Sequence, residues 1–197
     1  MIYTAVLMAC YNRVDSTLKC LSHLDTLKIP KNHKIEIYLT DDNSPDKTGE
    51  LVKKEYKEVN IIKGTGDLYW CGGMRLAWEY ALKNRDYDYF FWLNDDVYLF
   101  QDSLLDMLKE SKTNKHKAIV CGKTKSQITN QITYGIKDIK GNFINLNEEN
   151  EKGLLINGNC VLIPKYVFKR LGVFDSIFRH HLADYDYGLR ALKNKLK

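Results

Sequence analysis

Two adjacent carboxylates follow a short apolar run near the middle of the chain. Asp95 and Asp96, preceded by Asn94, come directly after the apolar residues 89–93. Adjacent carboxylates repel each other unless solvent, a cation or a positively charged group lies beside them. Acid and amide oxygens are also the ligands that Mg²⁺ and Mn²⁺ prefer. The spacing alone supports two interpretations equally: a divalent-metal site, or carboxylates that only cap a following turn or helix.

Polar residues of the same kind follow three other apolar segments. They are Tyr11, Asn12 and Arg13 after residues 2–9, Asp41 and Asp42 after residues 35–40, and the stretch 64–67 after residues 60–63. In a parallel sheet the carboxyl ends of the strands meet at one edge, and ligands bind there. We therefore expect all four polar segments to line one site.

Strands and helices alternate along the first half of the sequence. Apolar runs predict strands over 2–9, 35–40, 60–63 and 89–93. Helical spacing predicts a first helix over Leu18 to Leu27, capped by residues 15–17, and a second over 47–56. A third is predicted over 74–84, after a chain break at Gly72 and Gly73. This alternation predicts an α/β fold, with a mostly parallel, Rossmann-like sheet flanked by helices.

The second half predicts further core elements around a polar insertion. Helices are expected over 103–111, 165–171 and 187–197, with Gly172 as a C-cap, and strands over 118–121 and 154–164. Residues 123–152 are polar, and we expect a small irregular insertion with short hairpin strands there. With 197 residues and no repeat or linker, the chain is expected to form one domain.

Composition excludes several classes of protein. The chain is 44% apolar and 28% charged, with a net charge of +5. Its five cysteines form no CxxC pair, which argues against a zinc site or a disulfide framework and for a reducing, cytoplasmic location. Basic residues at 109–125 and 190–197 are compatible with a phosphate-bearing ligand or a peripheral contact with the inner face of a membrane, but they do not interleave with aromatics as in a nucleic-acid interface.

Six motifs occur in order along almost the whole chain. They are VLMACYNR (6–13), DDNSPDKT (41–48), GDLYWCGGMR (66–75), WLNDDV (92–97), INGNC (156–160) with GVFD (172–175), and ADYDYGLR (183–190). Together they resemble family 2 of the glycosyltransferases, the inverting enzymes with the GT-A fold, and above all rhamnosyl- and galactofuranosyltransferase-like members that build bacterial surface polysaccharides. The resemblance implies one GT-A domain over 1–197, with a nucleotide-sugar-binding half (1–97) and an acceptor-side half (98–197) that is shorter than in many relatives.

The resemblance assigns the first three motifs to a UDP- or dTDP-linked sugar donor. Tyr11 would pack on the base, Asp42 would accept a hydrogen bond from it, and Arg13 would lie near the phosphates. Gly72 and Gly73 would let the backbone approach the ribose or diphosphate, at the N-terminus of a phosphate-binding helix. The residues by themselves also allow plain packing for Tyr11, a turn cap for Asp42 and a simple loop at the glycines.

The fourth motif stands where relatives carry a DXD-type metal motif. The resemblance implies Asp96 as the first ligand of Mn²⁺ or Mg²⁺ and Asp95 as a contact to the donor sugar or ribose. Asn94 occupies the first metal-motif position, where relatives often have Asp. This change removes a charge and leaves the dependence on metal an open question.

The last motif implies the catalytic residue. Asp184 stands at the family's base position, where it would remove the proton of the acceptor hydroxyl in an inverting transfer. Asp186 is the second acid of the motif, and Ala183 replaces a Glu that relatives usually carry. A helix N-cap at Asp184 is compatible with this role.

These residues predict a hexosyltransferase-type enzyme that moves a sugar from the donor to a hydroxyl of a glycan or lipid-linked acceptor. One alternative is a non-catalytic nucleotide- or sugar-binding module, or an inactive, truncated GT-A domain. A sugar nucleotidyltransferase is a further alternative, but the glycine-rich basic loop that such enzymes carry after the first strand is missing at residues 9–12.

Overall fold

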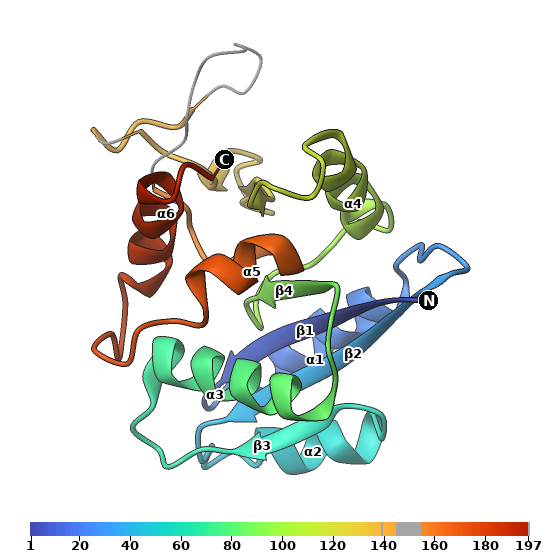
Figure 1. Ribbon diagram of the computed structural model, residues 1–197. Coiled ribbons are helices and arrows are strands. Elements are labelled where there is room, and N and C mark those ends of the chain that lie inside the picture. The colour runs from blue at the N-terminus through green and yellow to red at the C-terminus, as the bar shows by residue number, and fades with distance from the viewer. Residues whose placement is uncertain (139, 145–154, 197) are drawn as a thin grey trace.

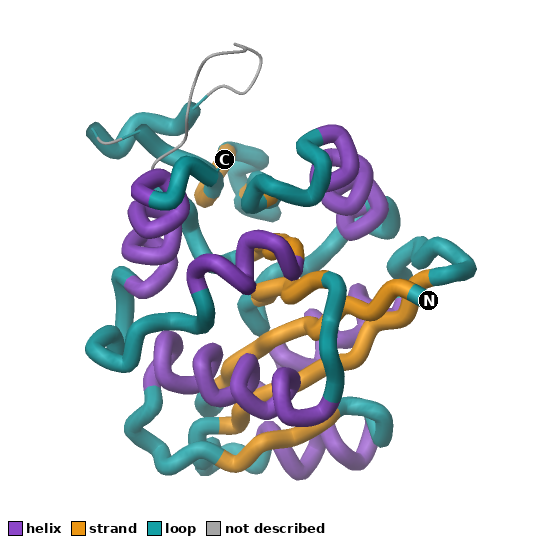
Figure 2. The backbone as a smooth tube through the Cα atoms, viewed as in Figure 1, coloured by secondary structure: helices purple, strands orange, loops and turns teal. Residues whose placement is uncertain are grey.

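A computed structural model describes residues 1–138, 140–144 and 155–196. The strands are β1 (Ile2–Cys10), β2 (His33–Asp41), β3 (Asn60–Lys63), β4 (Tyr89–Leu93), β5 (Val120–Cys121), β6 (Thr124–Lys125), β7 (Ile132–Tyr134) and β8 (Cys160–Pro164). The helices are α1 (Val14–Asp25), α2 (Thr48–Glu55), α3 (Tyr69–Asn84), α4 (Ser103–Thr113), α5 (Lys165–Leu171) and α6 (Ala183–Lys193). Helices cover both faces of a central sheet (Figure 1, Figure 2).

The central sheet has the strand order β3-β2-β1-β4-β8-β5. The four strands of the first half run parallel, whereas β8 runs antiparallel to β4 and to β5. Leu93 at the end of β4 lies opposite Cys160 at the start of β8. The residues that precede β8 therefore reach the same sheet edge as the residues that follow β1 and β4.

The core lies on both faces of the sheet. On one face, apolar side chains of β1, β4 and β8 pack against α3, α5 and α6, and Trp78 of α3 contacts the rings of Trp92 and Tyr187. On the other face, alternate residues of the same strands pack against α1, α2 and α4. All five residues of β4 are buried, as expected for a strand covered on both sides.

The structure confirms the predicted α/β class with a mainly parallel, helix-flanked sheet. The predicted bounds of β3, β4 and α5 match those observed, and Gly172 ends α5 with a φ of 71°. The hairpin of β6 and β7 lies within the predicted insertion. Residues 139 and 145–152 of that insertion are outside the described part of the chain.

Four local predictions are wrong. Within the described residues, the strand expected over 154–164 is observed only as β8, from Cys160 to Pro164. Gly72 and Gly73 do not break the chain, because α3 already begins at Tyr69. The first helix begins at Val14, so residues 15–17 lie inside it and do not cap it. The backbone N–H of Val14 donates to the Asp46 carboxylate. The last helix begins at Ala183, four residues before the predicted start, because Leu182 takes a left-handed conformation with a φ of 74° and serves as the N-cap.

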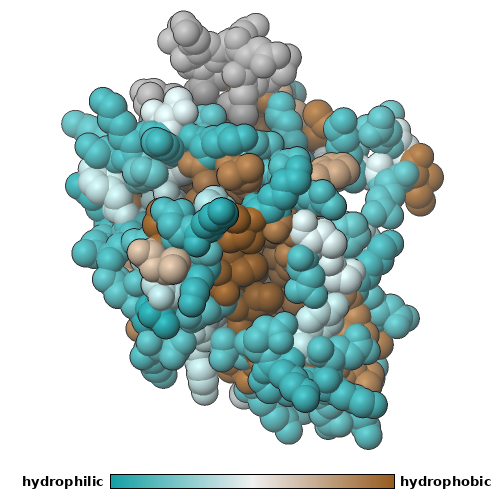
Figure 3. Space-filling model, turned by 90° about the vertical axis from the view of Figure 1, so that its right-hand side faces the viewer, coloured by the Kyte–Doolittle hydropathy of each residue, from teal (hydrophilic) through white to brown (hydrophobic). Residues whose placement is uncertain are grey.

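Two surface features complete the description. Among the residues that the structure describes, no helix is long and apolar enough to cross a membrane. On the face seen in Figure 3, apolar side chains gather near the centre, and hydrophilic ones border them.

Candidate active site

The Arg13 side chain joins the first polar segment to the acidic one. Its Nη1 lies 3.1 Å from Asp95 Oδ1 and its Nη2 lies 2.7 Å from Asp96 Oδ2. The first turn of α1 adds two hydroxyl donors, Thr17 Oγ1 to Asp95 Oδ2 and Ser16 Oγ to the Asp95 carbonyl. The repulsion expected between the two carboxylates is therefore offset by a guanidinium of the protein itself.

Asp95 is the buried member of the pair, with 3% of its surface exposed. Burial raises the pKa of Asp95 to about 6, because the charged form loses its hydration. Arg13 opposes that rise and the neighbouring Asp96 adds to it. The structure thus places Asp95 beneath the site and leaves Asp96 as the exposed acid at this edge.

Asn94 makes hydrogen bonds at both ends of its amide. Its Oδ1 accepts a hydrogen bond from Trp70 Nε1 at 2.7 Å, and its Nδ2 donates to Asn159 Oδ1. Its backbone N–H also donates to the Asn159 carbonyl. Both ends of the Asn94 amide therefore link the start of α3 to the residues before β8, while Oδ1 retains a second lone pair. Its role as a metal ligand stays a prediction.

The same junction positions Asp184. Gly158 lies under the Trp70 ring, so closely that a Cβ at position 158 would overlap it. The Gly158 N–H donates to Asp184 Oδ2 at 2.9 Å. Hydrogen bonds and packing thus connect Asn94, Trp70 and Asp184, although Asn94 and Asp184 are 90 residues apart in the sequence.

The Asp184 carboxylate lies in the first turn of α6 and is only 9% exposed. Burial raises the pKa of Asp184, while the N–H groups of Gly158 and Tyr185 lower it by donating hydrogen bonds to the charged form. The N-cap is Leu182 rather than Asp184. Each oxygen accepts one backbone hydrogen bond and retains a second lone pair, so the carboxylate can still accept a proton.

Asp42 shapes the glycine-containing loop that precedes α3. It is 5% exposed, its Oδ1 accepts the Gly66 N–H at 2.7 Å, and its Oδ2 accepts the N–H groups of Leu68 and Tyr69. The structure therefore gives Asp42 the cap-like role that its turn chemistry allowed. Its contact to a base stays a prediction.

Gly72 and Gly73 serve close packing inside α3. Both are buried, and a Cβ on Gly73 would come within 2.9 Å of the Ala9 Cβ of β1. The carbonyl of Arg179 accepts the N–H groups of Cys71 and Gly72, and Asp42 accepts those of Leu68 and Tyr69. The prediction of a helix start at these glycines is wrong, because α3 begins at Tyr69 and both glycines lie inside it. Their contact with the donor stays a prediction.

Tyr11 lies in the turn after β1, two residues before Arg13, and its side chain is 54% exposed. The turn that carries it is fixed at Asn12, which has a φ of 54° and donates its N–H to Ser44 Oγ. The ring is therefore available to a planar ligand, and its role in binding a base stays a prediction.

The structure adds site residues to which the sequence interpretation gave no role. Gly158 and Asn159 orient Asp184 and Asn94, and the Arg179 carbonyl caps α3. The Asn-Gly-Asn run at 157–159 is a turn signature that could have drawn attention to the first two. A capping carbonyl has no sequence signal, because every residue carries one.

The acidic pair fits a divalent cation only through Asp96. Its carboxylate is 43% exposed and accepts a hydrogen bond only from Arg13 among the described residues. Mg²⁺ and Mn²⁺ accept one or two protein carboxylates together with phosphate oxygens and water, and Asp96 supplies one. Within the described residues no group of three or more His, Cys, Asp or Glu side chains could hold a metal ion.

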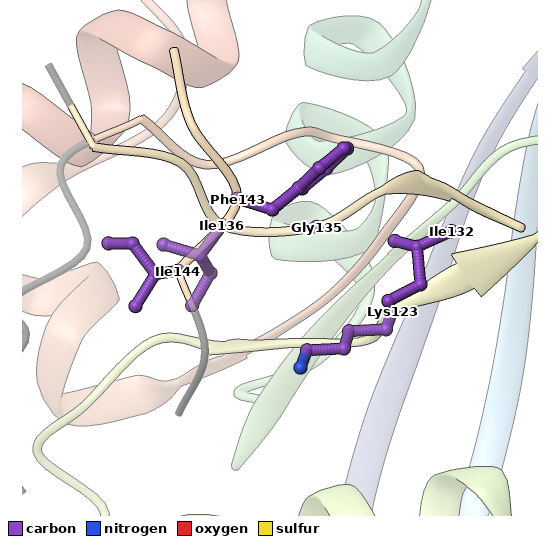
Figure 4. A pocket seen from close by; sticks show the side chains of 6 residues that line it. All are labelled: Lys123, Ile132, Gly135, Ile136, Phe143 and Ile144. Atoms are coloured by element: carbon purple, nitrogen blue, oxygen red, sulfur yellow. The ribbon is translucent and has the colours of Figure 1, made fainter. Parts of the chain in front are cut away.

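A cavity of about 270 Å³ lies in the insertion and not among these residues (Figure 4). It is lined by Lys123, Ile132, Gly135, Ile136, Phe143 and Ile144. Its lining is apolar apart from Lys123 and includes none of the predicted site residues.

Comparison with known sequences gives a consistent result. The profile of a family described as glycosyl transferase family 2 matches residues 5–172. An uncharacterized glycosyltransferase of Rickettsia typhi is 30% identical over 173 residues, which cover 81% of this chain and 50% of that protein. A poly-β-1,6-N-acetyl-D-glucosamine synthase of Staphylococcus epidermidis is 27% identical over 202 residues, which cover 94% of this chain and 48% of that enzyme. The chain thus spans about half the length of these relatives.

Solved structures share the fold at low sequence identity. TarS of S. aureus, residues 1–349, in complex with UDP-GlcNAc has a TM-score of 0.64 and 16% identity, over 97% of this chain and 53% of that one. A mannosyltransferase from Pyrobaculum calidifontis in complex with GDP-Man and Mn²⁺ has a TM-score of 0.64 and 15% identity, over 97% of this chain and 51% of that one.

Proposed function

Because the chain belongs to glycosyl transferase family 2, we propose that it is an inverting glycosyltransferase. In this proposal a sugar moves from a nucleotide diphosphate to a hydroxyl of a glycan or lipid-linked acceptor, with surface polysaccharide as the product. Neighbours in fold bind UDP-GlcNAc and GDP-Man, which supports a nucleotide-sugar donor, and we propose a UDP- or dTDP-sugar. The relative that makes poly-N-acetylglucosamine supports the polysaccharide role.

One observation carries the proposal: Asp184 is held at the same sheet edge as the acidic segment 94–96. The hydrogen bonds of Asn94 to Trp70 and Asn159, and of Gly158 to Asp184, join the two groups. A transfer between two bound molecules needs a base on the acceptor side and a place for the diphosphate close by. The junction supports the proposal because it holds a candidate for each at one edge of the sheet.

The proposed displacement has one step. The acceptor oxygen bonds to the anomeric carbon as the bond from that carbon to the diphosphate oxygen breaks, and the hydroxyl proton passes to Asp184. The Gly158 and Tyr185 N–H groups fix the orientation of the carboxylate. Attack from the side opposite the leaving group inverts the anomeric centre.

On the donor side, Tyr11 would stack on the base and the Asp42-bound loop at 64–69 would border it. Arg13 and Asp95 would lie beneath the diphosphate and the sugar. Gly72 and Gly73, which are buried in α3, would support the donor site by letting the helix lie close to β1.

Asp96 is the residue that would hold Mn²⁺ or Mg²⁺. The cation would neutralise the charge of the departing nucleoside diphosphate. Asn94 Oδ1 accepts one hydrogen bond, from Trp70, and its second lone pair would be the further protein ligand.

Donor hydrolysis tests the proposal. Wild-type protein with Mn²⁺ should release UDP or dTDP from a matching sugar nucleotide, and Asp184→Ala should abolish release while it still binds the nucleotide. A thermal-shift screen of UDP and dTDP identifies the nucleobase of the donor, and its repetition with Mn²⁺ and with EDTA shows whether binding needs the metal. Nucleotide binding with no turnover on any acceptor would instead support a binding module, and no shift with either nucleotide would contradict the donor assignment.

We also propose a cytoplasmic location, with the acceptor presented at the inner face of a membrane. The five cysteines are free thiols, which supports a reducing compartment. Fractionation of cells that express the tagged full-length protein tests this location.

A further inference from the structure

The Arg13 guanidinium makes two ion pairs that differ in burial. The Asp95 side chain, 3.1 Å from Nη1, is 4% exposed. The Arg13 and Asp96 side chains, which meet at 2.7 Å, are 47% and 43% exposed. Ion pairs that water reaches are weak, whereas a buried partner is costly to leave without its counter-charge. The Asp95 contact is therefore the permanent one, and the Asp96 contact is the one that can exchange.

The surroundings of the two acids reinforce this difference. Asp95 is also held by Thr17 Oγ1, and its carbonyl is held by Ser16 Oγ. The Asp96 carboxylate accepts a hydrogen bond only from Arg13 among the described residues. The Asp96 carboxylate fits a divalent cation, and Arg13 already occupies one of its two oxygens.

We propose that Arg13 is an exchangeable counter-ion of the donor site. It neutralises Asp96 while no donor is bound, and it turns to the donor's diphosphate when a divalent cation takes the Asp96 carboxylate. The proposal rests on the proposed function, since it takes Asp96 as the metal-binding carboxylate and a nucleoside diphosphate as the ligand. The guanidinium fork pairs with phosphate as readily as with carboxylate, and Asp95 keeps it in place during the exchange.

This exchange makes metal and nucleotide depend on each other. Without nucleotide, the cation must displace the Arg13 nitrogen from Asp96 and then lie beside an unpaired guanidinium, so it binds weakly. With nucleotide, the diphosphate receives the guanidinium and adds ligands to the cation. Arg13→Gln removes the competitor, so the variant should bind Mn²⁺ alone about tenfold more tightly than wild type.

The experiment is a Mn²⁺ titration of the full chain without nucleotide, with free Mn²⁺ measured by electron paramagnetic resonance. Arg13→Gln should show the tighter Kd, and Arg13→Gln combined with Asp96→Asn should lose the gain. Lys28→Gln is the matched control, because Lys28 is a similarly exposed cation paired with Asp102 away from the site, and it should bind Mn²⁺ as wild type does. An Arg13→Gln Kd within twofold of the wild-type value, or a gain that survives Asp96→Asn, would overturn the proposal.

A second measurement uses the unaltered protein and does not depend on the variants folding. The Nε–H signal of Arg13 in a ¹⁵N NMR spectrum should move when Mg²⁺ and UDP are added together, because the guanidinium changes partner. A signal that stays in place although UDP binds overturns the exchange. Neither experiment involves turnover, so failure of the exchange is distinct from failure of glycosyl transfer, which donor hydrolysis reports.

Discussion

At the scale of single residues, burial and hydrogen bonding act in opposite directions on Asp184. Burial raises its pKa above the ordinary value of 3.8, and two backbone N–H donors limit the rise. A base must be unprotonated to act. The rate of transfer should therefore rise with pH through an apparent pKa above 3.8, rather than through that of an exposed aspartate.

Asp184→Asn keeps the size of the side chain and removes the proposed base. The transfer rate should fall by roughly 10²- to 10⁴-fold, because general-base catalysis typically contributes that much. The measurement is kcat/KM against pH for both proteins, with circular dichroism to show that the variant folds. If kcat/KM of Asp184→Asn still fell at low pH as in wild type, the titrating group would be another residue.

Asp95 gives a prediction for stability. Its pKa rises from 3.8 to about 6 on folding, so the folded state holds the proton more tightly than the unfolded state. Its stabilising contribution is thus fully present below pH 3.8 and is lost as the pH rises through 6. Asp95→Asn does not titrate, so the free energy of unfolding of wild type relative to this variant should fall by about 2 to 3 kcal/mol between pH 4 and pH 7.

Urea unfolding of both proteins at several pH values measures that difference. Asp106→Asn on the exposed face of α4 is a suitable control, because Asp106 is paired with Lys109 at the surface. A difference between wild type and Asp95→Asn that does not change with pH would contradict the assignment.

The sequence identified the types of these residues but not their partners. Arg13, Asp95 and Asp96 could be selected because they follow expected strands, and Asp184 because its motif resembles the family's base position. The ion pairs of Arg13 and the amide contacts of Asn94 span 24 to 83 residues of sequence, and no local pattern encodes them. For Asn94 the residue type predicts a metal ligand, but it does not predict the hydrogen bond that Oδ1 accepts from the Trp70 indole N–H.

At the scale of elements, α3 shows how small residues set a helix against a sheet. Gly73 lies where a Cβ would approach Ala9 of β1 to within 2.9 Å, and the Gly73 carbonyl accepts a hydrogen bond from Thr40 of β2. The glycine pair was taken for a chain break because glycine usually interrupts helices. Long-range packing outweighs that preference here.

Gly73→Ala should therefore destabilise the protein, although alanine favours helices. Overpacking of a filled site costs about 1 to 3 kcal/mol, against a gain in helix propensity of up to about 1 kcal/mol. Chemical denaturation measures the net loss. Gly135→Ala is the matched control, because a Cβ there meets its neighbours only at ordinary contact distances, and equal stability of the two variants would contradict the packing argument.

The contact of Gly158 with Trp70 couples the residues before β8 to α3. A methyl group at position 158 forces the Trp70 ring to move, so Gly158→Ala should lower both stability and transfer. In a Trp70→Ala background the same change should cost less, by a coupling free energy on the order of 1 kcal/mol. Additive effects in this double-mutant cycle would show that the two residues do not act together.

Element bounds were predictable where residue types change abruptly. The apolar run of β4 and the Pro164 and Gly172 boundaries of α5 gave correct limits. The start of α6 was missed because Leu182 adopts a left-handed conformation that a leucine does not signal. The free-energy cost of this Leu182 conformation is offset by the contacts of α6 that hold Asp184 in place.

At the scale of the whole molecule, the site lies where segments from both halves of the chain meet. The loop before α3, the acidic segment after β4, the residues before β8 and the start of α6 contact one another through Trp70, Asn94 and Gly158. Binding of a donor should therefore stabilise these four segments together.

Hydrogen exchange measures this prediction. UDP with Mn²⁺ should increase amide protection over residues 66–72, 94–97, 157–160 and 179–185. Exchange in α4, whose contacts lie on the other face of the sheet, should stay unchanged. Protection confined to the first two segments would show that the donor does not engage the base side of the site.

The antiparallel course of β8 has a consequence for how such a chain can diversify. The segment from Gly122 to Asn159 leaves and re-enters the sheet at neighbouring points, and the Gly122 N–H donates to the Cys160 carbonyl at 2.8 Å. Doubling the length of a loop whose ends are so joined costs only about 0.6 kcal/mol in closure entropy. The part of this stretch that leaves Asn157, Gly158 and Asn159 in place can therefore be replaced, by evolution or in a grafting experiment, while the parallel strands β1 to β4 and the support of Asp184 stay intact.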